Sequence, residues 1–298
     1  MIDGVLPDPR RHAYREGLAA ESMRGQKGVA LRYVTGELRQ VAVPALPLRR
    51  EPRFNAILHT EALFGETLTL FDESEGWAWV QLARDDYVGY MPSEGLTTTI
   101  MTPTHRVAVL RTYVYPSPDI KTPPLVLLSL NSLLPVAGDV DRFLALKSGG
   151  FVIAEHVRTL DEHAGDFVDV ALAFCGTPYL WGGRTSLGVD CSGLVQLASE
   201  AAGLACPRDT DMQVKEIGRQ VDWQGDGALT RGDLVFWDGH VGIMAGPRDL
   251  VHASAYEMVV VEEPLAEARD RIITSKGGKI VGVRRPAYLS ASGAMHLT

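Results

Sequence analysis

The sequence predicts two small β-barrels in tandem, followed by a domain of mixed α+β structure. Between Glu37 and Val157, short apolar runs with alternating polar positions are separated by proline and glycine, a pattern typical of short half-buried strands. Gly89–Glu94 and Gly150–Glu155 share one pattern at a separation of about 60 residues, which indicates an internal repeat. From about Arg158 onward, helical spacing occurs together with strand-like runs.

Length and composition restrict the class of protein. The chain has 298 residues, of which 46% are hydrophobic and 22% charged, so several cores can form and disorder, collagen and coiled coil are excluded. Asp and Glu number 37 against 29 Lys and Arg, a formal charge of -8 that leaves no basic surplus for a nucleic acid partner. We expect no membrane span, because even Pro123–Pro135 is interrupted by Ser129, Asn131 and Ser132.

The N-terminus and the cysteines favour a cytoplasmic protein. Met1–Gly17 contains charged residues and no apolar core or small-residue cleavage site, so we expect no secretion signal. The cysteines are Cys175, Cys191 and Cys206. This odd set lacks the spacing of a metal site, which predicts neither a disulfide framework nor a metal ion. A reducing compartment is therefore expected.

Four segments follow from these patterns. Residues 1–36 form an N-terminal extension with a weakly helical stretch at Arg11–Met23, and residues 37–100 form the first barrel. Residues 101–158 form a second, divergent barrel, and residues 159–298 form the α+β domain. The aromatic residues of the first barrel are expected to fill its core, although they could instead form a platform on which a ligand stacks. They are Trp77, Trp79, Tyr87 and Tyr90.

The α+β domain is predicted to contain a helix at Phe167–Phe174 and another at Cys191–Ala202. In the later helix, apolar residues recur at helical spacing, Asp190 precedes it as an N-cap, and Gly203 follows it as a stop signal. Short turns separate the strand-like runs that come next, which predicts an antiparallel meander packed on this helix. The runs are Asp233–Trp237, His240–Ala245, Val251–Ser254, Met258–Val261 and Ile280–Val283.

Cys191 stands at the start of its predicted helix, where a thiol is favoured as the thiolate. Unpaired backbone N–H groups and the positive end of the helix dipole both lower the pKa of a thiol at this position. The alternative is a small apolar side chain that fills a contact between helix and sheet, and we assign that role to Cys175 and Cys206. Cys191 is therefore the candidate nucleophile.

Two histidines distinguish Cys191 from an ordinary buried cysteine. His240 opens one predicted strand, His252 lies in the next, and Gly246 is the midpoint between them. A hairpin centred on Gly246 would bring the two imidazoles face to face on one surface of the sheet. One imidazole could then accept the thiol proton while the other holds the first in the required tautomer.

Five motifs, in order along residues 160–288, resemble the NlpC/P60 family of cysteine peptidases. They are Tyr179–Gly183, Asp190–Val195, Arg231–Trp237, Gly239–Ile243 and Val251–Ala253. Agreement of five motifs in order and spacing makes the resemblance specific. In the first predicted barrel, Phe64–Glu66, Gly76–Val80 and Asp86–Tyr90 resemble a bacterial SH3-like domain, whereas the second barrel is a poorer match.

The resemblance implies an α+β papain-like (NlpC/P60) catalytic domain preceded by two small all-β SH3-like barrels. It implies hydrolysis of amide bonds in cell-wall peptides, typically between D-γ-glutamyl and a diamino acid, with no cofactor. It further implies that Cys191 is the nucleophile, His240 the general base and His252 the residue that orients this base. Tyr179 matches a family tyrosine that points toward the thiol, although packing against the neighbouring loop is an equal alternative.

SH3-like domains ahead of such a peptidase resemble a cytoplasmic subgroup of the family that trims murein peptides in wall recycling. This resemblance implies release of L-Ala-γ-D-Glu from murein-derived peptides with a free N-terminal amine. Asp190 and Ser192 are candidates to receive the amine, because a desolvated ammonium needs acceptors nearby. Tyr87 is a further candidate, because the resemblance implies that this position reaches the cleft and closes the amine pocket. Asp190 could equally be a helix N-cap, and Tyr87 could equally be a barrel core residue.

Two other functions use the same sequence features. A non-catalytic module that binds wall peptides or proteins would depend on the SH3-like domains, and an acyl transferase would use the same cysteine and histidines. The intact set of Cys191, His240 and His252 favours the peptidase. Arg208 and Gln213 follow the predicted active helix, where they could line the cleft or lie on a surface loop.

Overall fold

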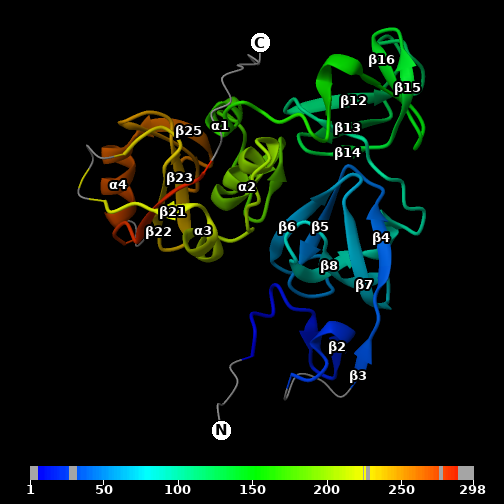
Figure 1. Cartoon of the computed structure of the whole chain (residues 1–298), viewed down its shortest axis with the longest axis horizontal. Coiled ribbons are helices and arrows are strands. Elements are labelled where there is room, and N and C mark those ends of the chain that lie inside the picture. The colour runs from blue at the N-terminus through cyan, green and yellow to red at the C-terminus, as the bar shows by residue number, and fades with distance from the viewer. Residues whose placement is uncertain (1–5, 27–31, 224, 226–228, 275–277, 288–298) are drawn as a thin grey trace. The chain divides into compact units, whose positions relative to one another are not determined.

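The computed structural model describes residues 6–26, 32–223, 225, 229–274 and 278–287 (Figure 1). The chain divides into two compact units. The first comprises residues 1–106, 112–128 and 132–155, and the second comprises residues 107–111, 129–131 and 156–298. Two short stretches from the first half of the chain therefore belong to the second unit. The limits at residues 36, 100 and 158 that the sequence suggests for the four segments stay a prediction.

A seven-stranded antiparallel sheet forms the first barrel. Its strands are β4 (Glu37–Val41), β5 (Ala45–Arg49), β6 (Leu58–Leu63), β7 (Thr67–Ser74), β8 (Trp77–Leu82), β9 (Val88–Pro92) and β10 (Leu96–Thr97). They are ordered β10-β4-β7-β8-β9-β5-β6. The alternation predicted along β7 is confirmed, because Leu68 and Leu70 are buried while the flanking threonines are partly exposed.

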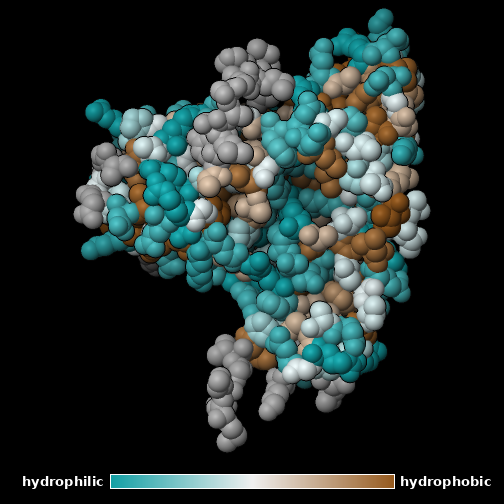
Figure 2. Space-filling model, in the orientation of Figure 1, coloured by the Kyte–Doolittle hydropathy of each residue, from teal (hydrophilic) through white to brown (hydrophobic). Residues whose placement is uncertain are grey.

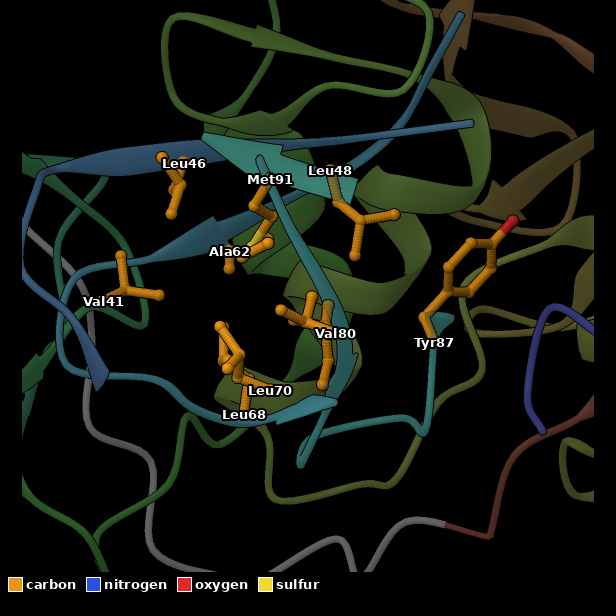
Figure 3. Close-up of a cluster of buried hydrophobic side chains, with 11 residues drawn as sticks. Val41, Leu46, Leu48, Ala62, Leu68, Leu70, Val80, Tyr87 and Met91 are labelled. Carbon is orange, nitrogen blue, oxygen red and sulfur yellow. The ribbon is translucent and has the colours of Figure 1, made fainter. Parts of the chain in front are cut away.

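The core of this barrel is a cluster of buried side chains that includes Leu68, Val80 and Met91 (Figure 3). Tyr87 belongs to the cluster and is 2% exposed. Its ring lies at the edge of the cluster, with the hydroxyl directed away from the aliphatic side chains (Figure 3). That hydroxyl makes a hydrogen bond of 3.3 Å with Nδ1 of His59. Tyr87 therefore occupies the barrel-core position that was one of its two predicted roles.

The N-terminal extension forms strands where the sequence favours a weak helix. Its elements are β1 (Tyr14–Arg15), β2 (Leu18–Ala20), a 3-10 turn at Glu21–Met23 and β3 (Arg32–Val34). Gly17, with a φ of +74°, allows the tight turn through which β1 pairs with β2. The helix predicted at Arg11–Met23 is therefore wrong.

Arg15 holds the extension against the aromatic face of the first barrel. Its guanidinium lies 4.8 Å from the centre of the Trp79 ring, donates a hydrogen bond of 2.8 Å to the Tyr90 hydroxyl, and forms an ion pair with Asp72. Apolar side chains of the extension, among them Met23, pack with Trp79 in one buried cluster. Because Trp79 is only 3% exposed, it packs in the fold and does not present a platform on which a ligand could stack.

A second group of strands follows the first barrel. It comprises β11 (His105–Val107), β12 (Arg111–Tyr115), β13 (Val126–Ser129), β14 (Leu133–Leu134), β15 (Val136–Val140), β16 (Phe143–Leu146) and β17 (Phe151–Ile153). Five of them form a sheet in the order β13-β12-β17-β16-β15. The predicted repeat has a structural counterpart, because β9 and β17 are each followed by a 3-10 turn, at Ser93–Gly95 and Ala154–His156.

Strand β18 (Val157–Thr159) precedes the elements of the α+β domain. Its helices are α1 (Phe167–Ala173), α2 (Cys191–Ala201), α3 (Thr210–Glu216) and α4 (Leu265–Thr274). Its strands are β19 (Arg184–Thr185), β20 (Gly188–Val189), β21 (Arg219–Gln220), β22 (Leu234–Trp237), β23 (His240–Met244), β24 (Asp249–Ser254), β25 (Val259–Pro264) and β26 (Gly282–Arg285). The sequence predicts α1 and α2 but not α3 or α4. Helix α4 buries Leu265 and Ala268 among its 10 residues, too few apolar positions for a clear helical pattern.

The main sheet of this domain has six strands in the order β21-β26-β22-β23-β24-β25. The predicted meander is confirmed, since β22, β23, β24 and β25 pair in sequence and antiparallel, and β26 pairs with β22. Helix α2 packs against β23 and β24, and α4 packs against β24 and β25. Figure 1 shows this sheet between α2 and α4. The first turn of α2 thus lies near the end of the sheet at which β23 begins.

Within the described residues, the structure contains no helix that is long and apolar enough to cross a membrane. On the face shown in Figure 2, hydrophilic residues predominate and hydrophobic residues lie in small groups.

Candidate active site

Cys191 is the first residue of α2, as the sequence predicts. Its side chain is buried, and its Sγ lies 4.0 Å from the carbonyl oxygen of Gly239, in the turn between β22 and β23. The helix starts in close contact with the preceding loop, because a Cβ on Gly193 would come within 2.4 Å of the carbonyl oxygen of Gly183. The thiol is therefore held at a junction between helix, loop and sheet.

Asp190 caps α2 and is fully engaged in hydrogen bonds. Its Oδ1 accepts from the backbone N–H of Gly193 at 2.7 Å, and its Oδ2 accepts from that of Gly182 at 2.8 Å. Arg208 donates to both oxygens, through Nη1 at 3.0 Å and Nη2 at 2.7 Å. The N-cap role of Asp190 is thus present in the structure, with its charge balanced by a buried guanidinium.

Ser192 belongs to the same buried network. Its hydroxyl donates to Oδ1 of Asp190 at 3.2 Å and accepts from Nη1 of Arg208 at 2.7 Å. Gln213 stabilises the first turn of α2, since its Nε2 donates to the carbonyl oxygens of Ser192 at 3.0 Å and Pro207 at 2.8 Å. Arg208 and Gln213 are at most 1% exposed, so the suggestion that they lie on a surface loop is wrong.

His240 and His252 lie in adjacent strands with their rings in contact. Nε2 of His240 is 2.7 Å from Nδ1 of His252, and the ring centres are 5.0 Å apart. The hairpin is centred on Pro247 and not on Gly246, because the N–H of Ala245 donates to the carbonyl oxygen of Asp249. The imidazoles are therefore diagonal neighbours on one face of the sheet, and not directly opposed as the sequence suggests.

Two residues that the sequence reasoning missed extend this pair. Nε2 of His252 is 2.7 Å from Oε1 of Glu263 in β25. Arg271 in α4 forms an ion pair with Glu263, donating from Nη1 to Oε2 at 2.8 Å and from Nη2 to Oε1. Because β25 pairs Leu250 with Glu263, the carboxylate is a diagonal neighbour of His252. Glu263 could have been found as an acidic residue two positions after Val261 on the same face of this strand. It was missed because the predicted strand ended at Val261.

The surroundings of Cys191 and His240 keep both side chains neutral. Burial raises the pKa of the Cys191 thiol to about 12, and the nearby Asp190 carboxylate acts in the same direction. Burial lowers the pKa of His240 to about 3, with further lowering by His252 and Arg271. The pKa of the thiol is therefore raised, and not lowered as the position at the helix N-terminus suggests, because desolvation outweighs the opposing effects of Arg208 and of the backbone N–H groups of Val241 and Ser192.

Tyr179 and Tyr87 lie in different units. Tyr179 is partly buried in the second unit, where burial, followed by the charges of Cys191 and Asp190, raises the pKa of its phenol. The phenol is therefore a neutral hydroxyl, and its role toward the thiol stays a prediction. Tyr87 belongs to the first unit, whereas the other predicted site residues belong to the second. Among the described residues, no cluster of His, Cys, Asp and Glu is placed to hold a metal ion.

Comparisons with known proteins identify two families that match parts of this chain. The model of the NlpC/P60 family matches residues 176–272, and the model of the bacterial dipeptidyl-peptidase SH3 domain matches residues 48–96. Dipeptidyl-peptidase 6 of Lysinibacillus sphaericus is 32% identical over 237 residues, which cover 70% of this chain and 84% of that protein. A γ-D-glutamyl-L-lysine dipeptidyl-peptidase of Bacillus cereus is 27% identical over 242 residues, covering 70% of this chain and 71% of the relative.

A solved structure supports the fold. The crystal structure of an NlpC/P60 family protein from Bacillus cereus superimposes with a TM-score of 0.69 at 21% identity, over 84% of this chain and 99% of that one. With the match to the SH3 domain, it confirms the predicted class, an α+β catalytic domain preceded by small β-barrels.

Proposed function

The chain belongs to the NlpC/P60 family and is a peptidase, and from this premise we propose that it hydrolyses the γ-D-glutamyl-diamino acid bond of murein-derived peptides. The observation that carries the proposal is the position of the Cys191 thiol at the start of α2, in the domain that holds the hydrogen-bonded pair His240–His252. The names of two relatives, γ-D-glutamyl-L-lysine dipeptidyl-peptidases of Bacillus cereus and Bacillus subtilis, support the choice of bond.

In the proposed reaction, Cys191 is the nucleophile and His240 the general base. Since the thiol and the imidazole are both neutral, the proton passes from Sγ to His240 as the sulfur attacks the carbonyl carbon. His240 then delivers this proton to the departing nitrogen of the diamino acid, which leaves a γ-glutamyl thioester. Water attacks the thioester and gives a proton to His240, which returns it to the sulfur.

His252 orients the base, and Tyr179 is proposed to contact the substrate beside the thiol. The backbone N–H groups of Ser192 and Val241 hydrogen-bond toward Sγ and partly oppose the effect of burial on its pKa. They are available to stabilise negative charge as the sulfur begins to attack.

The nucleophile is tested by replacing each cysteine in turn. Cys191→Ala should reduce turnover by more than about 100-fold without loss of fold, because the covalent route disappears. Cys175→Ala is the matched control, since Cys175 is exposed and should tolerate the change with full activity. Turnover by Cys191→Ala above about one hundredth of the wild-type rate would contradict the assignment.

We propose that the substrate carries a free N-terminal amine, so that L-Ala-γ-D-Glu is released. Asp190, Ser192 and Tyr87 are the amine contacts that the sequence suggests, but both oxygens of Asp190 and the hydroxyl of Ser192 already bind Arg208 or backbone N–H groups, so Tyr87 is the contact retained in this proposal. The test compares L-Ala-γ-D-Glu-diaminopimelate with the same peptide acetylated on alanine, by mass spectrometry. Cleavage of only the free peptide supports amine recognition, and Tyr87→Phe should then raise KM. Equal cleavage of both peptides would refute it.

A role in murein recycling further requires that the enzyme meets these peptides in the cytoplasm. The three unpaired cysteines support this location. Fractionation of the native host tests it, and recovery of most of the protein outside the inner membrane would overturn the recycling role. Mass spectrometry of reactions with an added amine would detect acyl transfer, whereas the non-catalytic binding module no longer applies to a peptidase.

A further inference from the structure

A partly buried ion pair lies on the far side of His252 from His240. The carboxylate of Glu263 contacts Nε2 of His252, and the guanidinium of Arg271 contacts the two oxygens of that carboxylate. We propose that Glu263, held by Arg271, is a positioning residue that sets the proton arrangement of the two histidines and leaves Nδ1 of His240 free to accept the thiol proton. This inference rests on the proposed role of His240 as the base.

Each contact from Arg271 to His240 joins one hydrogen-bond donor to one acceptor. The guanidinium of Arg271 can only donate hydrogen bonds, because it has no acceptor atom. The carboxylate of Glu263 therefore accepts from it, and an ionised carboxylate has no proton to donate to His252. Nε2 of His252 must therefore carry a proton and donate it to Glu263 at 2.7 Å. In a neutral imidazole the other nitrogen, Nδ1, is then an acceptor.

The protonation of His240 follows from that of His252. Since Nδ1 of His252 accepts, Nε2 of His240 must donate across the 2.7 Å contact. Nδ1 of neutral His240 is then left without a proton and carries a lone pair. This is the protonation state that a base needs before it can receive the proton of a thiol.

The ionised state of Glu263 follows from its neighbours. Burial tends to raise its pKa, but the hydrogen bonds from His252 and Arg271 outweigh burial and lower the pKa to about 2. Other charged and titratable groups also face this chain of contacts. Tyr256 and Glu257 lie near Arg271, while Cys191 and Asp190 lie beside the thiol end. At neutral pH, Glu263 therefore accepts and cannot donate.

The position of Arg271 is set by the packing of α4. Leu265 and Ala268 are buried against the sheet, and Arg271 follows them at the same spacing of three residues, on the same side of the helix. Its guanidinium also lies 5.2 Å from the ring centre of Tyr256. The ion pair with Glu263 is thus anchored from two sides, which keeps the carboxylate in place.

Glu263→Gln tests the inference, with Glu262→Gln as the matched control on the opposite side of β25. An amide cannot accept at both oxygen positions, so it either loses Arg271 or presents N–H to His252 and reverses the protons. We expect kcat to fall about 10- to 100-fold with KM unchanged. Glu262 is exposed, and its variant should keep the wild-type kcat.

A double-mutant cycle separates positioning from a structural role. If Glu263 acts through His252, Glu263→Gln should cost less than about twofold in kcat when introduced into His252→Asn. Equal losses of kcat in the two backgrounds, or wild-type kcat in Glu263→Gln, would overturn the inference. If Glu263→Gln fails to fold, Arg271→Lys replaces it, because lysine keeps the charge but cannot make both contacts with the carboxylate. Arg271→Lys should lower kcat about 3- to 10-fold, and by less in the His252→Asn background.

The two proposals fail in different ways. Turnover that survives Cys191→Ala would remove the proposed nucleophile and the reaction built on it. Turnover could instead depend on Cys191 while the losses of kcat caused by Glu263→Gln and His252→Asn add up in the double variant. That result would leave the peptidase mechanism in place and reject only the positioning role of Glu263.

Discussion

Arg208 and Asp190 form a two-pronged ion pair directly before the proposed nucleophile, with N–O distances of 2.7 and 3.0 Å. Arg208 is 1% exposed, so the pair is sheltered from water. The pair joins the residue that caps α2 to the segment that follows this helix. The charge of the cap is therefore balanced inside the domain, before any substrate binds.

Removal of the guanidinium should destabilise the catalytic domain strongly. Arg208→Met leaves the Asp190 carboxylate buried without its partner, and we expect a loss of about 3 to 5 kcal/mol in the free energy of unfolding. Urea denaturation of the variant and the wild-type protein measures this difference in the free energy of unfolding. Arg219→Met, at an exposed strand position, should change stability by less than about 0.5 kcal/mol. Equal effects of the two substitutions would show that the buried pair contributes little.

The neutral thiol predicts a characteristic alkylation profile. Because burial raises the pKa of Cys191 to about 12, its reaction with iodoacetamide should be slow at pH 6 and should accelerate about tenfold per pH unit through pH 9. Mass spectrometry of the alkylated peptides gives the rate, with the exposed Cys175 as reference in the same molecule. Selective labelling of Cys191 at pH 6 would instead demonstrate a preformed thiolate.

Mild acid should destabilise the fold through His240. The unfolded chain takes up a proton near pH 6.5, whereas burial lowers the pKa of His240 in the folded state to about 3. The stability contribution is therefore present above pH 6.5 and is lost as the pH falls toward 3, up to about 2 kcal/mol by pH 5. Urea titrations at pH 7.5 and 5.0 measure the loss. His240→Asn should show a smaller loss than Glu262→Gln, and equal losses would contradict the explanation.

The N-terminal extension should stabilise the first barrel through Arg15. Arg15→Ala removes its contacts with Trp79, Tyr90 and Asp72, for an expected loss of about 1 to 2 kcal/mol. The emission of Trp79 should also shift to longer wavelength as water reaches the ring. Arg53→Ala, which breaks an exposed pair with Glu51, serves as the control. An unchanged emission spectrum in Arg15→Ala would indicate that the extension stays bound without this contact.

Local sequence patterns predicted the parts of the fold that depend on local order. Alternation located most of the strands, and the N-cap and stop signals around α2 placed Asp190 and Gly203 correctly. Helix α4 was missed because two buried residues make a weak pattern. The weakly helical reading of the extension failed because Gly17 and the packing on Trp79 favour strands there.

The site residues that stand in short sequence motifs could be predicted. Those whose contacts depend on strand register could not. Cys191, His240 and His252 stand in motifs, and the structure places them in one domain. Glu263 and Arg271 lie in segments without a motif, and their contact with His252 depends on how β24 pairs with β25. The burial of Arg208 likewise depends on the path of the chain after α2, which no local pattern shows.

The network around Asp190 bears on how sequences of similar proteins are interpreted. The start of α2 is held by hydrogen bonds to Gly182, Gly193 and Arg208, none of which reacts with a substrate. A related chain could keep the cysteine and both histidines and still lack this arginine. Its catalytic residues would all be present, but the carboxylate that caps the helix would have no cationic partner and the thiol would not be held in place. We expect such a chain to be an inactive member that is mistaken for an active one.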